Sequence, residues 1–316
     1  MTTRERWPSF VIIGAQKAAS TTLLDTLRSH PSIWMPAEED AFLRDPVYDE
    51  DRIEEFEQRY SGRKEPLVGL KCPDYLARPE VPARIAQHNS SARLILIVRN
   101  PIERAVSAYY WRVRWGALPI VDVNDGLRNL RSDKYSSIDP TASEILTWGL
   151  YAEHLDRYLQ YFDRDHILVL VDSDLRQQPR KTVRAALEFL GAPETGWEPH
   201  SSKTSNEGVY SLTRLRFLQL RNRIILKWNA DKSYYTIFRP ANPVLRLYSN
   251  LIAAIDRWIL ARIYKNTKPR LDPDTYRYLE DYYRADSTRL QELLRRRIAG
   301  WPLDPNSALA TVESAE

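Results

Sequence analysis

The sequence predicts an α/β fold with a central parallel β-sheet flanked by helices on both faces. Residues 9–13 form a β-branched apolar run that a short loop joins to a helical pattern. Residues 93–98 form a continuous apolar run, as expected for a central parallel strand buried on both faces. Because strands that alternate with helices along a chain pair in parallel, we expect one sheet covered on both sides.

The individual elements follow one another in the order that such a sheet requires. The strand at residues 9–13 ends at Gly14, and the helix after Ser20 stops near His30, because a residue before proline disfavours helical geometry. Residues 194–272 lack the alternation and are rich in Trp, Tyr and Arg, so we expect loops and helices there on the same core. Further strands are expected at 67–70, 93–98 and 166–171, and helices at 102–115, 151–162, 181–190 and 273–297.

Composition narrows the class of protein. A chain of 316 residues, 43% of them hydrophobic, is long enough for one sizeable α/β domain. The net charge of +4 and the pI near 9.0 suit an anionic ligand. The single cysteine, Cys72, excludes an internal disulfide, and no apolar stretch reaches the roughly 18 residues of a membrane span. We therefore expect a cytoplasmic protein without a signal peptide.

The segment 14–22, Gly-Ala-Gln-Lys-Ala-Ala-Ser-Thr-Thr, lies between the first strand and the first helix. Backbone N–H groups and the positive end of a helix dipole meet there, which suits a phosphate or sulfate. Lys17 adds a full charge in mid-loop, toward a group being transferred. The loop is P-loop-like but not a Walker A sequence, because its lysine comes early and Ala19 stands where a second glycine is expected. A Ser/Thr helix cap beside a solvated lysine is the alternative.

A second group of polar residues follows the strand at 93–98. Arg99 stands at the carboxyl end of that strand, where ligands bind in open α/β sheets. A guanidinium there can hold a phosphate with two parallel hydrogen bonds. Ser107 lies two turns into the helix that follows. The two groups together predict a nucleotide site at one edge of the sheet.

The two segments resemble the nucleotide-binding signatures of sulfotransferases that use 3′-phosphoadenosine 5′-phosphosulfate (PAPS). That family has a Gly-x-x-Lys-x-x-[Ser/Thr]-[Thr/Ser] loop for the 5′-phosphosulfate and an Arg-[Asp/Asn]-Pro-x-x-Arg-x-x-Ser segment for the 3′-phosphate. The resemblance covers about residues 9–200 and the C-terminal helix. It is closer to bacterial members near the heparan-sulfate and Golgi-type branch than to the small-phenol type. Ala19 departs from the pattern, since many relatives have glycine there.

The resemblance implies PAPS as co-substrate, adenosine 3′,5′-bisphosphate as product, and no metal. The five histidines also match no metal-site spacing. Looser matches at 148–151 and 203–210 resemble segments near the adenine and over the 3′-phosphate. The nucleotide-binding residues so implied are Gly14, Gln16, Lys17, Ala18, Ala19, Ser20, Thr21, Thr22, Arg99, Ser107, Tyr151, Lys203 and Tyr210.

The resemblance also indicates the acceptor side. Residues 35–43 align with a Lys-Glu-x-His-Phe-Phe segment of the heparan-type branch, which places Glu39 on the general base. Glu38 or Asp40 is an alternative general base. The segment could instead be a solvated acidic turn without a catalytic role. Lys71 belongs to a segment that resembles Glu-Lys-[Ser/Thr]-Pro-x-Tyr and is expected near the sulfate or the acceptor. The implied catalytic residues are thus Lys17, Glu39 and Lys71.

We therefore predict an enzyme that transfers a sulfuryl group from PAPS to a hydroxyl or amine by in-line displacement. The acceptor is expected to be a small molecule, a saccharide or a lipid-linked compound. No nucleic acid partner is expected, peripheral membrane contact stays open, and so does the oligomeric state. We assign residues 1–316 to a single domain with a core at about 9–200, an acceptor and cap region at about 201–272, a helix at about 273–297 and a disordered tail after about 305.

Two other classes of protein compete with this prediction. A P-loop-type nucleotide kinase needs a lysine beside Ser20 and an acidic Mg²⁺ ligand after a strand, for which Asp172 is the candidate. A non-catalytic nucleotide-binding or membrane-surface module is the other class. The basic and aromatic residues 228–264 are expected to line the acceptor pocket, pack on the core or lie on lipid headgroups.

Overall fold

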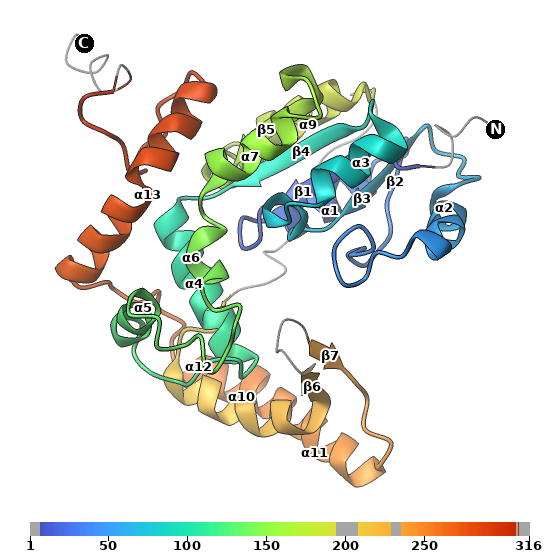
Figure 1. Cartoon of the computed structure of the whole chain (residues 1–316). Helices are drawn as coiled ribbons and strands as arrows, with labels where there is room; N and C mark the ends of the chain where they lie inside the picture. The colour runs from blue at the N-terminus through green and yellow to red at the C-terminus, as the bar shows by residue number, and fades with distance from the viewer. Residues whose placement is uncertain (1–6, 194–207, 229–234, 308, 310–316) are drawn as a thin grey trace. The chain divides into compact units, whose positions relative to one another are not determined.

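The computed structural model of the chain describes residues 7–193, 208–228, 235–307 and 309. Its apolar runs form one parallel sheet in the order β2-β3-β1-β4-β5 (Figure 1). The predicted central parallel sheet is therefore confirmed, and the structure adds the short strand β2 at one edge. The strands are β1 (Phe10–Gly14), β2 (Ile33–Trp34), β3 (Leu67–Lys71), β4 (Arg93–Val98) and β5 (Ile167–Val171).

Helices and short 3₁₀ turns connect these strands. The second helix after β5, residues Pro179–Leu190, ends where Gly191 takes a left-handed conformation, with φ 72°. These elements are α1 (Ser20–Arg28), η2 (Glu50–Arg52), α2 (Ile53–Tyr60), η3 (Tyr75–Ala77), α3 (Val81–Asn89), α7 (Tyr151–Leu159), η4 (Arg164–His166), α8 (Asp172–Gln177) and α9 (Pro179–Leu190).

The sheet buries both of its faces. Side chains alternate across a strand, so β1 sends Phe10 and Ile12 to one face and Val11 and Ile13 to the other. The first pair lies in a cluster with the apolar side chains of α1 and α9, and the second pair in a cluster with those of α3 and α7. The prediction of helices on both faces is confirmed, and the carboxyl edge of the sheet stays available for a site.

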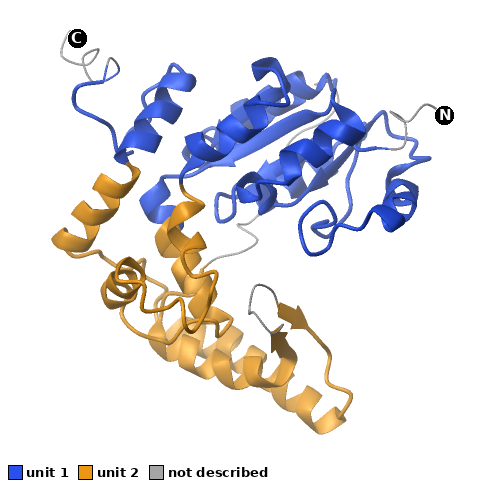
Figure 2. Ribbon diagram, viewed as in Figure 1, with its two compact units in different colours: residues 1–104, 150–206, 284–316 blue, residues 105–149, 207–283 orange. Residues whose placement is uncertain are grey.

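The chain divides into two compact units (Figure 2). The sheet unit consists of residues 1–104, 150–206 and 284–316, and the helical unit of residues 105–149 and 207–283. Two compact units are compatible with one domain or with two, so the assignment of one domain stays a prediction. The remaining elements are α4 (Pro101–Arg114), α5 (Val123–Arg131), α6 (Glu144–Thr147), α10 (Leu212–Ile225), β6 (Leu226–Trp228), β7 (Tyr235–Ile237), α11 (Pro243–Ile255), the π-helical η5 (Asp256–Leu260), α12 (Ala261–Ile263) and α13 (Pro273–Leu293).

The region after residue 207 differs from its sequence-based prediction in one respect. Helices were expected and are present, but β6 and β7 also pair as an antiparallel hairpin, with Leu226 opposite Ile237. Strands of three residues are too short to give an alternating pattern, which is why the sequence did not predict them. Arg214 of α10 binds both oxygens of Asp256 at 2.9 Å and joins α10 to η5. Within the described ranges, no helix is both long and apolar enough to span a bilayer.

Candidate active site

The loop between β1 and α1 has a backbone that few side chains tolerate. A Cβ atom at Gly14 would lie 3.0 Å from the Cβ of Leu76 and 3.1 Å from the carbonyl oxygen of Pro73, so only glycine fits there. Lys17 and Ala19 have φ angles of 67° and 68°, in the left-handed region that disfavours residues with a Cβ. Left-handed residues in such a loop turn successive backbone N–H groups toward one concave side, as in anion-binding nests.

Helix α1 continues this loop and presents its positive end to the same place. Ala19 is the N-cap residue and Ser20 the first helical residue, so no Ser or Thr side chain caps this helix. The first turn contains no acidic residue. Its backbone N–H groups therefore carry the partial positive charge of the helix dipole without a capping side chain. Ser20 is buried, and Thr21 and Thr22 are half-buried with hydroxyls in this first turn.

Lys71 connects the loop to residues 38–40, Glu-Glu-Asp, which we call the acidic segment. It is the last residue of β3, its side chain is 1% exposed, and its Nζ donates to the Oγ1 of Thr21 at 3.0 Å. The same ammonium forms a short ion pair with the Oε1 of Glu39. The backbone N–H of Asp40 donates to the carbonyl of Lys71 at 3.1 Å and holds the acidic segment beside β3. The predicted catalytic residues Lys71 and Glu39 and the predicted nucleotide-binding residue Thr21 are thus in direct contact.

The three neighbouring carboxylates have different surroundings. Asp40 is buried, accepts a hydrogen bond from the Tyr60 hydroxyl at 2.7 Å and lies 3.1 Å from the Arg59 guanidinium. Burial, and then the Asp40 charge, raises the pKa of the Tyr60 hydroxyl well above its ordinary value, so Tyr60 stays a donor. Glu38 is exposed. Glu39 is half-exposed and forms the pair with the lysine at the end of β3, which favours it over its neighbours as the group that faces a ligand.

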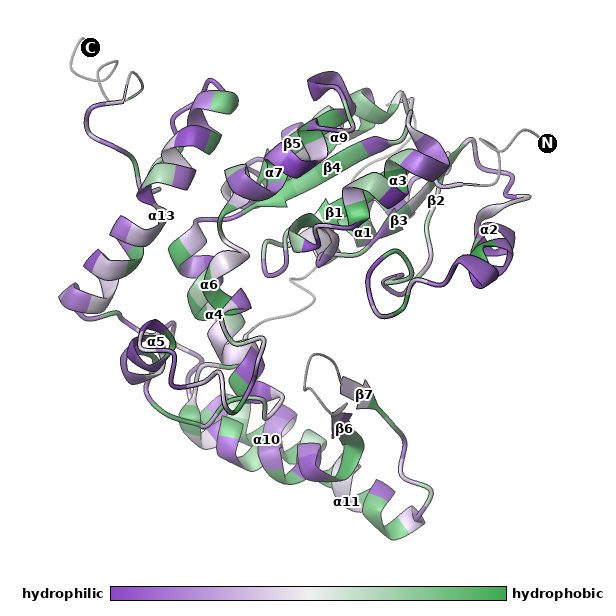
Figure 3. Cartoon of the chain, viewed as in Figure 1, coloured by the Kyte–Doolittle hydropathy of each residue, from purple (hydrophilic) through white to green (hydrophobic). Residues whose placement is uncertain are grey.

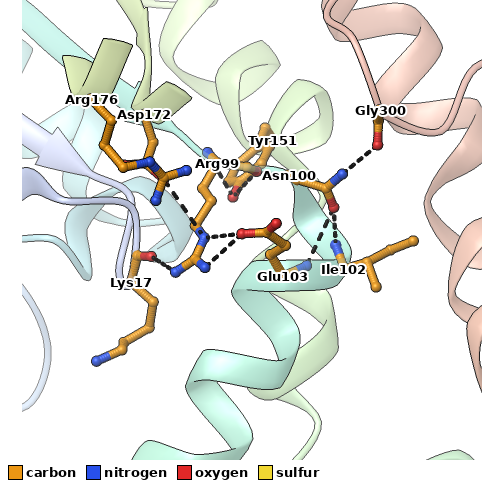
Figure 4. A network of polar contacts seen from close by, with 9 residues as sticks. All are labelled: Lys17, Arg99, Asn100, Ile102, Glu103, Tyr151, Asp172, Arg176 and Gly300. Atoms are coloured by element: carbon orange, nitrogen blue, oxygen red, sulfur yellow. Dashed lines mark hydrogen bonds and ion pairs between the residues drawn. The ribbon is translucent and has the colours of Figure 1, made fainter. Parts of the chain in front are cut away.

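Arg99 follows β4 directly and lies at the centre of a network of polar contacts (Figure 4). Its Nη1 donates to the carbonyl oxygen of Lys17 at 3.3 Å, whereas the Lys17 side chain points away from it (Figure 4). Its Nε and Nη2 donate to the Oε2 of Glu103 at 3.1 and 2.7 Å. Asp172, buried at the start of α8, lies 3.7 Å from the Arg99 Nε and 2.8 Å from Arg176. The network holds the guanidinium beside the loop between β1 and α1.

Tyr151 supports the backbone that carries this arginine. Its hydroxyl donates to the carbonyl oxygen of Arg99 at 2.9 Å, and its side chain is fully buried at the start of α7. Burial raises the pKa of Tyr151 to about 12, so the hydroxyl remains protonated at neutral pH. The Asn100 Oδ1 then caps α4 by accepting from the N–H of Ile102 at 3.0 Å. The predicted position of Tyr151 near an adenine stays a prediction.

The other predicted nucleotide-binding residues lie elsewhere in the chain. Ser107 is buried on the part of α4 that belongs to the helical unit. Tyr210 belongs to the same unit, and its backbone N–H donates to the Oδ1 of Asn266 at 2.9 Å. Lys203 lies outside the described residues. Ala18 is a residue of the loop itself, and its side chain is buried in the core cluster of the sheet unit.

Three acidic residues that contact this site are not among the residues predicted for a sulfotransferase, and one of them, Asp172, was considered only as the Mg²⁺ ligand of a kinase. Glu103 and Asp172 both hold the guanidinium at the end of β4, and Asp74 accepts from the Nε2 of Gln16 at 3.4 Å. The sequence did contain a signal for two of them. Glu103 is four residues after Arg99, in the first turn of α4, and Asp172 follows a strand directly. Asp172 pairs with arginines here, and the described part of the chain contains no cluster of three or more His, Cys, Asp or Glu that could hold a metal.

These features define a P-loop-like α/β protein with a loop suited to an anion after its first strand and cationic side chains at the carboxyl edge of its sheet. The chain belongs to the sulfotransferase domain family, which matches residues 8–224.

Two curated relatives come from Mus musculus. Heparan sulfate glucosamine 3-O-sulfotransferase 6 is 30% identical over 219 residues, which cover 67% of this chain and 60% of the relative. Heparan sulfate glucosamine 3-O-sulfotransferase 3B1 is 30% identical over 207 residues, which cover 66% of this chain and 52% of the relative. The chain thus spans 52–60% of the length of these relatives. The crystal structure of a sulfotransferase from Alicyclobacillus acidocaldarius has the same fold, with a TM-score of 0.63 at 22% identity over 93% of this chain and 98% of that one.

Proposed function

We propose that this chain is a PAPS-dependent sulfotransferase that modifies a hydroxyl or amine of a saccharide, glycolipid or natural product. The observation that carries the proposal is the contact of Lys71 with both Thr21 of the loop and Glu39 of the acidic segment. A donor-binding loop and a candidate base are thereby brought to one buried cation. Membership in the sulfotransferase domain family supports the same chemistry.

The donor nucleotide would lie along the carboxyl edge of the sheet. Backbone N–H groups of the loop and the hydroxyls of residues 20–22 would hold the 5′-phosphosulfate, because they present donors and the helix dipole to one anion. Arg99 would hold the 3′-phosphate through its guanidinium, kept in position by Asp172 and by the Lys17 carbonyl. The family resemblance also predicts that Ser107, Lys203 and Tyr210 contact the 3′-phosphate.

The reaction would be an in-line displacement at sulfur. The acceptor oxygen or nitrogen forms a bond to sulfur, its proton passes to the Glu39 carboxylate, and the bond between sulfur and the bridging oxygen of the 5′-phosphate breaks. Lys17 would neutralise charge that develops on the departing adenosine 3′,5′-bisphosphate. Lys71 would hold Glu39 in place and offset charge on the sulfuryl oxygens. The side chains supply the positive charge in this scheme, which requires no metal.

Binding of adenosine 3′,5′-bisphosphate, AMP and ATP, measured by calorimetry, tests the donor site. A charge-assisted hydrogen bond contributes about 1.5–3 kcal/mol, so we expect the bisphosphate to bind about 10- to 100-fold more tightly than AMP. Arg99→Ala should remove this difference and leave AMP affinity nearly unchanged. Equal affinity of the wild-type chain for AMP and the bisphosphate would refute the donor assignment, and tight binding of ATP with Mg²⁺ would favour a kinase.

Incubation with labelled PAPS and a panel of acceptors, read by mass shift, tests the transfer itself. A mass increase of one sulfuryl group on an acceptor hydroxyl or amine is the expected result. We also propose that the acceptor is a saccharide, glycolipid or natural product and that the enzyme acts in the cytoplasm. Bisphosphate binding without any transfer to the panel or to cell extracts would favour the non-catalytic nucleotide-binding alternative.

A further inference from the structure

The segment from α11 to α12 carries an apolar face that is exposed within its unit. The face comprises Val244, Leu247, Leu251, Trp258, Ile259 and Ile263, whose exposed fractions lie between 51% and 71%. Most residues of α11 are hydrophobic, interrupted by a few polar ones (Figure 3). Single exposed apolar residues are ordinary in proteins, but a continuous set of this size marks a surface that binds something.

The spacing of these residues places them along one side of the helical segment. Residues 244, 247 and 251 are separated by three and four positions, and residues 259 and 263 by four, the spacing of one helical face. The buried side of α11 is a different one, formed by Ser249 and Ile252. The core of the helical unit therefore does not use the apolar face.

Charge on this segment is of one sign. Residues 235–271 contain seven of the chain's 46 Lys and Arg residues but only one of its 42 Asp and Glu residues. The rest of the chain is therefore close to neutral. The single acid, Asp256, is buried and bound by Arg214 at 2.9 Å through both oxygens. The charge that this segment exposes is consequently positive. The basic residues are Arg239, Arg246, Arg257, Arg262, Lys265, Lys268 and Arg270.

An exposed apolar helix face with aromatic and basic side chains, and without exposed acids, matches the chemistry of an anionic lipid surface. Helices of this kind bury apolar side chains at the headgroup boundary, while Lys and Arg contact anionic headgroups. The Arg262 guanidinium lies 5.9 Å from the Trp258 ring centre, a pairing of a cation with an amphipathic aromatic side chain. We propose that α11, η5 and α12 bind the surface of an anionic bilayer.

Co-sedimentation of the full chain with vesicles tests this proposal. We expect binding to phosphatidylcholine vesicles that contain phosphatidylglycerol, weaker binding to phosphatidylcholine alone, and a decrease with added salt. Leu247→Asp with Leu251→Asp should abolish binding. Arg262→Gln and Lys265→Gln should each weaken it about 5-fold, which corresponds to about 1 kcal/mol for each basic residue near an anionic surface.

Matched controls separate this effect from general changes of charge or apolar surface. Ile138→Asp changes an exposed apolar residue outside the face, and Lys181→Gln removes an exposed charge on α9. Both should leave vesicle binding unchanged, and circular dichroism should show that all variants are folded. Absence of wild-type binding to anionic vesicles, or an equal loss in the controls, would overturn the proposal. A wild-type dimer that Leu247→Asp converts to a monomer, without vesicle binding by either, would show that a second copy covers the face.

Discussion

Ala19 is the loop residue whose replacement by glycine we expect to stabilise the protein. Its φ of 68° and ψ of 19° place it in the left-handed region, where the Cβ of an alanine lies too close to the backbone. It is also the N-cap of α1, a position where glycine is favoured over alanine. The loop nevertheless keeps this conformation, because Gly14 before it and the helix after it determine the path of the chain.

The expected gain follows from two opposing terms. Relief of left-handed strain contributes about 1–2 kcal/mol. The greater freedom of glycine in the unfolded chain costs about 0.4–1 kcal/mol. Ala19→Gly should therefore stabilise the sheet unit by about 0.7 kcal/mol. Ala18→Gly is the matched control, since Ala18 is fully buried and has no positive φ. It loses a buried methyl group, worth about 0.8 kcal/mol, in addition to the chain-entropy term, and should destabilise by about 1.5 kcal/mol.

Thermal unfolding of the two variants measures the difference in sign. With an unfolding entropy of about 2.1 cal/mol/K per residue, the gap of about 2 kcal/mol between them corresponds to about 3 °C in Tm. The expected order of the midpoints is Ala19→Gly above the wild type and the wild type above Ala18→Gly. If both variants lose stability by the same amount, Ala19 carries no backbone strain and the argument from its φ angle is wrong.

Three further predictions concern chemistry and pH. Lys17→Ala should lower turnover about 10²–10³-fold in steady-state kinetics and should lower nucleotide affinity much less in calorimetry. The reason is that the charge of Lys17 matters most as negative charge develops on the leaving group. Unchanged turnover would contradict this role. Glu39→Gln should lower turnover about 10²–10⁴-fold with nucleotide affinity nearly unchanged. Glu38→Gln should be active, and Asp40→Asn should mainly lower the unfolding free energy. A large loss of turnover in Glu38→Gln or Asp40→Asn, with an active Glu39→Gln, would assign the general base to that other carboxylate. Asp286 accepts from the first-turn N–H groups of α7 at 3.1 and 2.9 Å, and burial raises its pKa to about 6 from 3.8. Because this pKa is raised in the folded state, the stability that protonated Asp286 contributes is complete below about pH 4 and is lost as pH rises through 6. Urea unfolding should show the wild type losing up to about 3 kcal/mol relative to Asp286→Asn between pH 4 and 6, and a pH-independent difference would exclude the raised pKa.

Local patterns allowed most of the sheet unit to be predicted. The run at 93–98 is apolar at every position after Arg93 because β4 is buried on both faces, and Gly191 ends α9 where a left-handed residue is required. The helix expected at 151–162 ends earlier, at Leu159, since helix ends depend on contacts that a sequence pattern does not contain. The hairpin β6–β7 was not predicted for a related reason. Its strands are defined by the hydrogen bonds between them, and three residues in each are too few to show a strand-like alternation of apolar and polar residues.

The sequence by itself determined the class of protein and the chemistry that its side chains offer. The order of strand, loop and helix, with Lys17 in the loop and Arg99 after the best strand, was sufficient, because these features depend on residues close together in the chain. Only the tertiary structure decided which groups meet. Glu39 faces Lys71 across 32 residues, and Asp172 reaches Arg99 across 73, because the parallel order β3-β1-β4-β5 brings the carboxyl ends of these strands to one edge. Strand order and register are global properties of packing, so no local pattern could have shown that Asp40 is buried against Tyr60 while its neighbour Glu39 faces a cation.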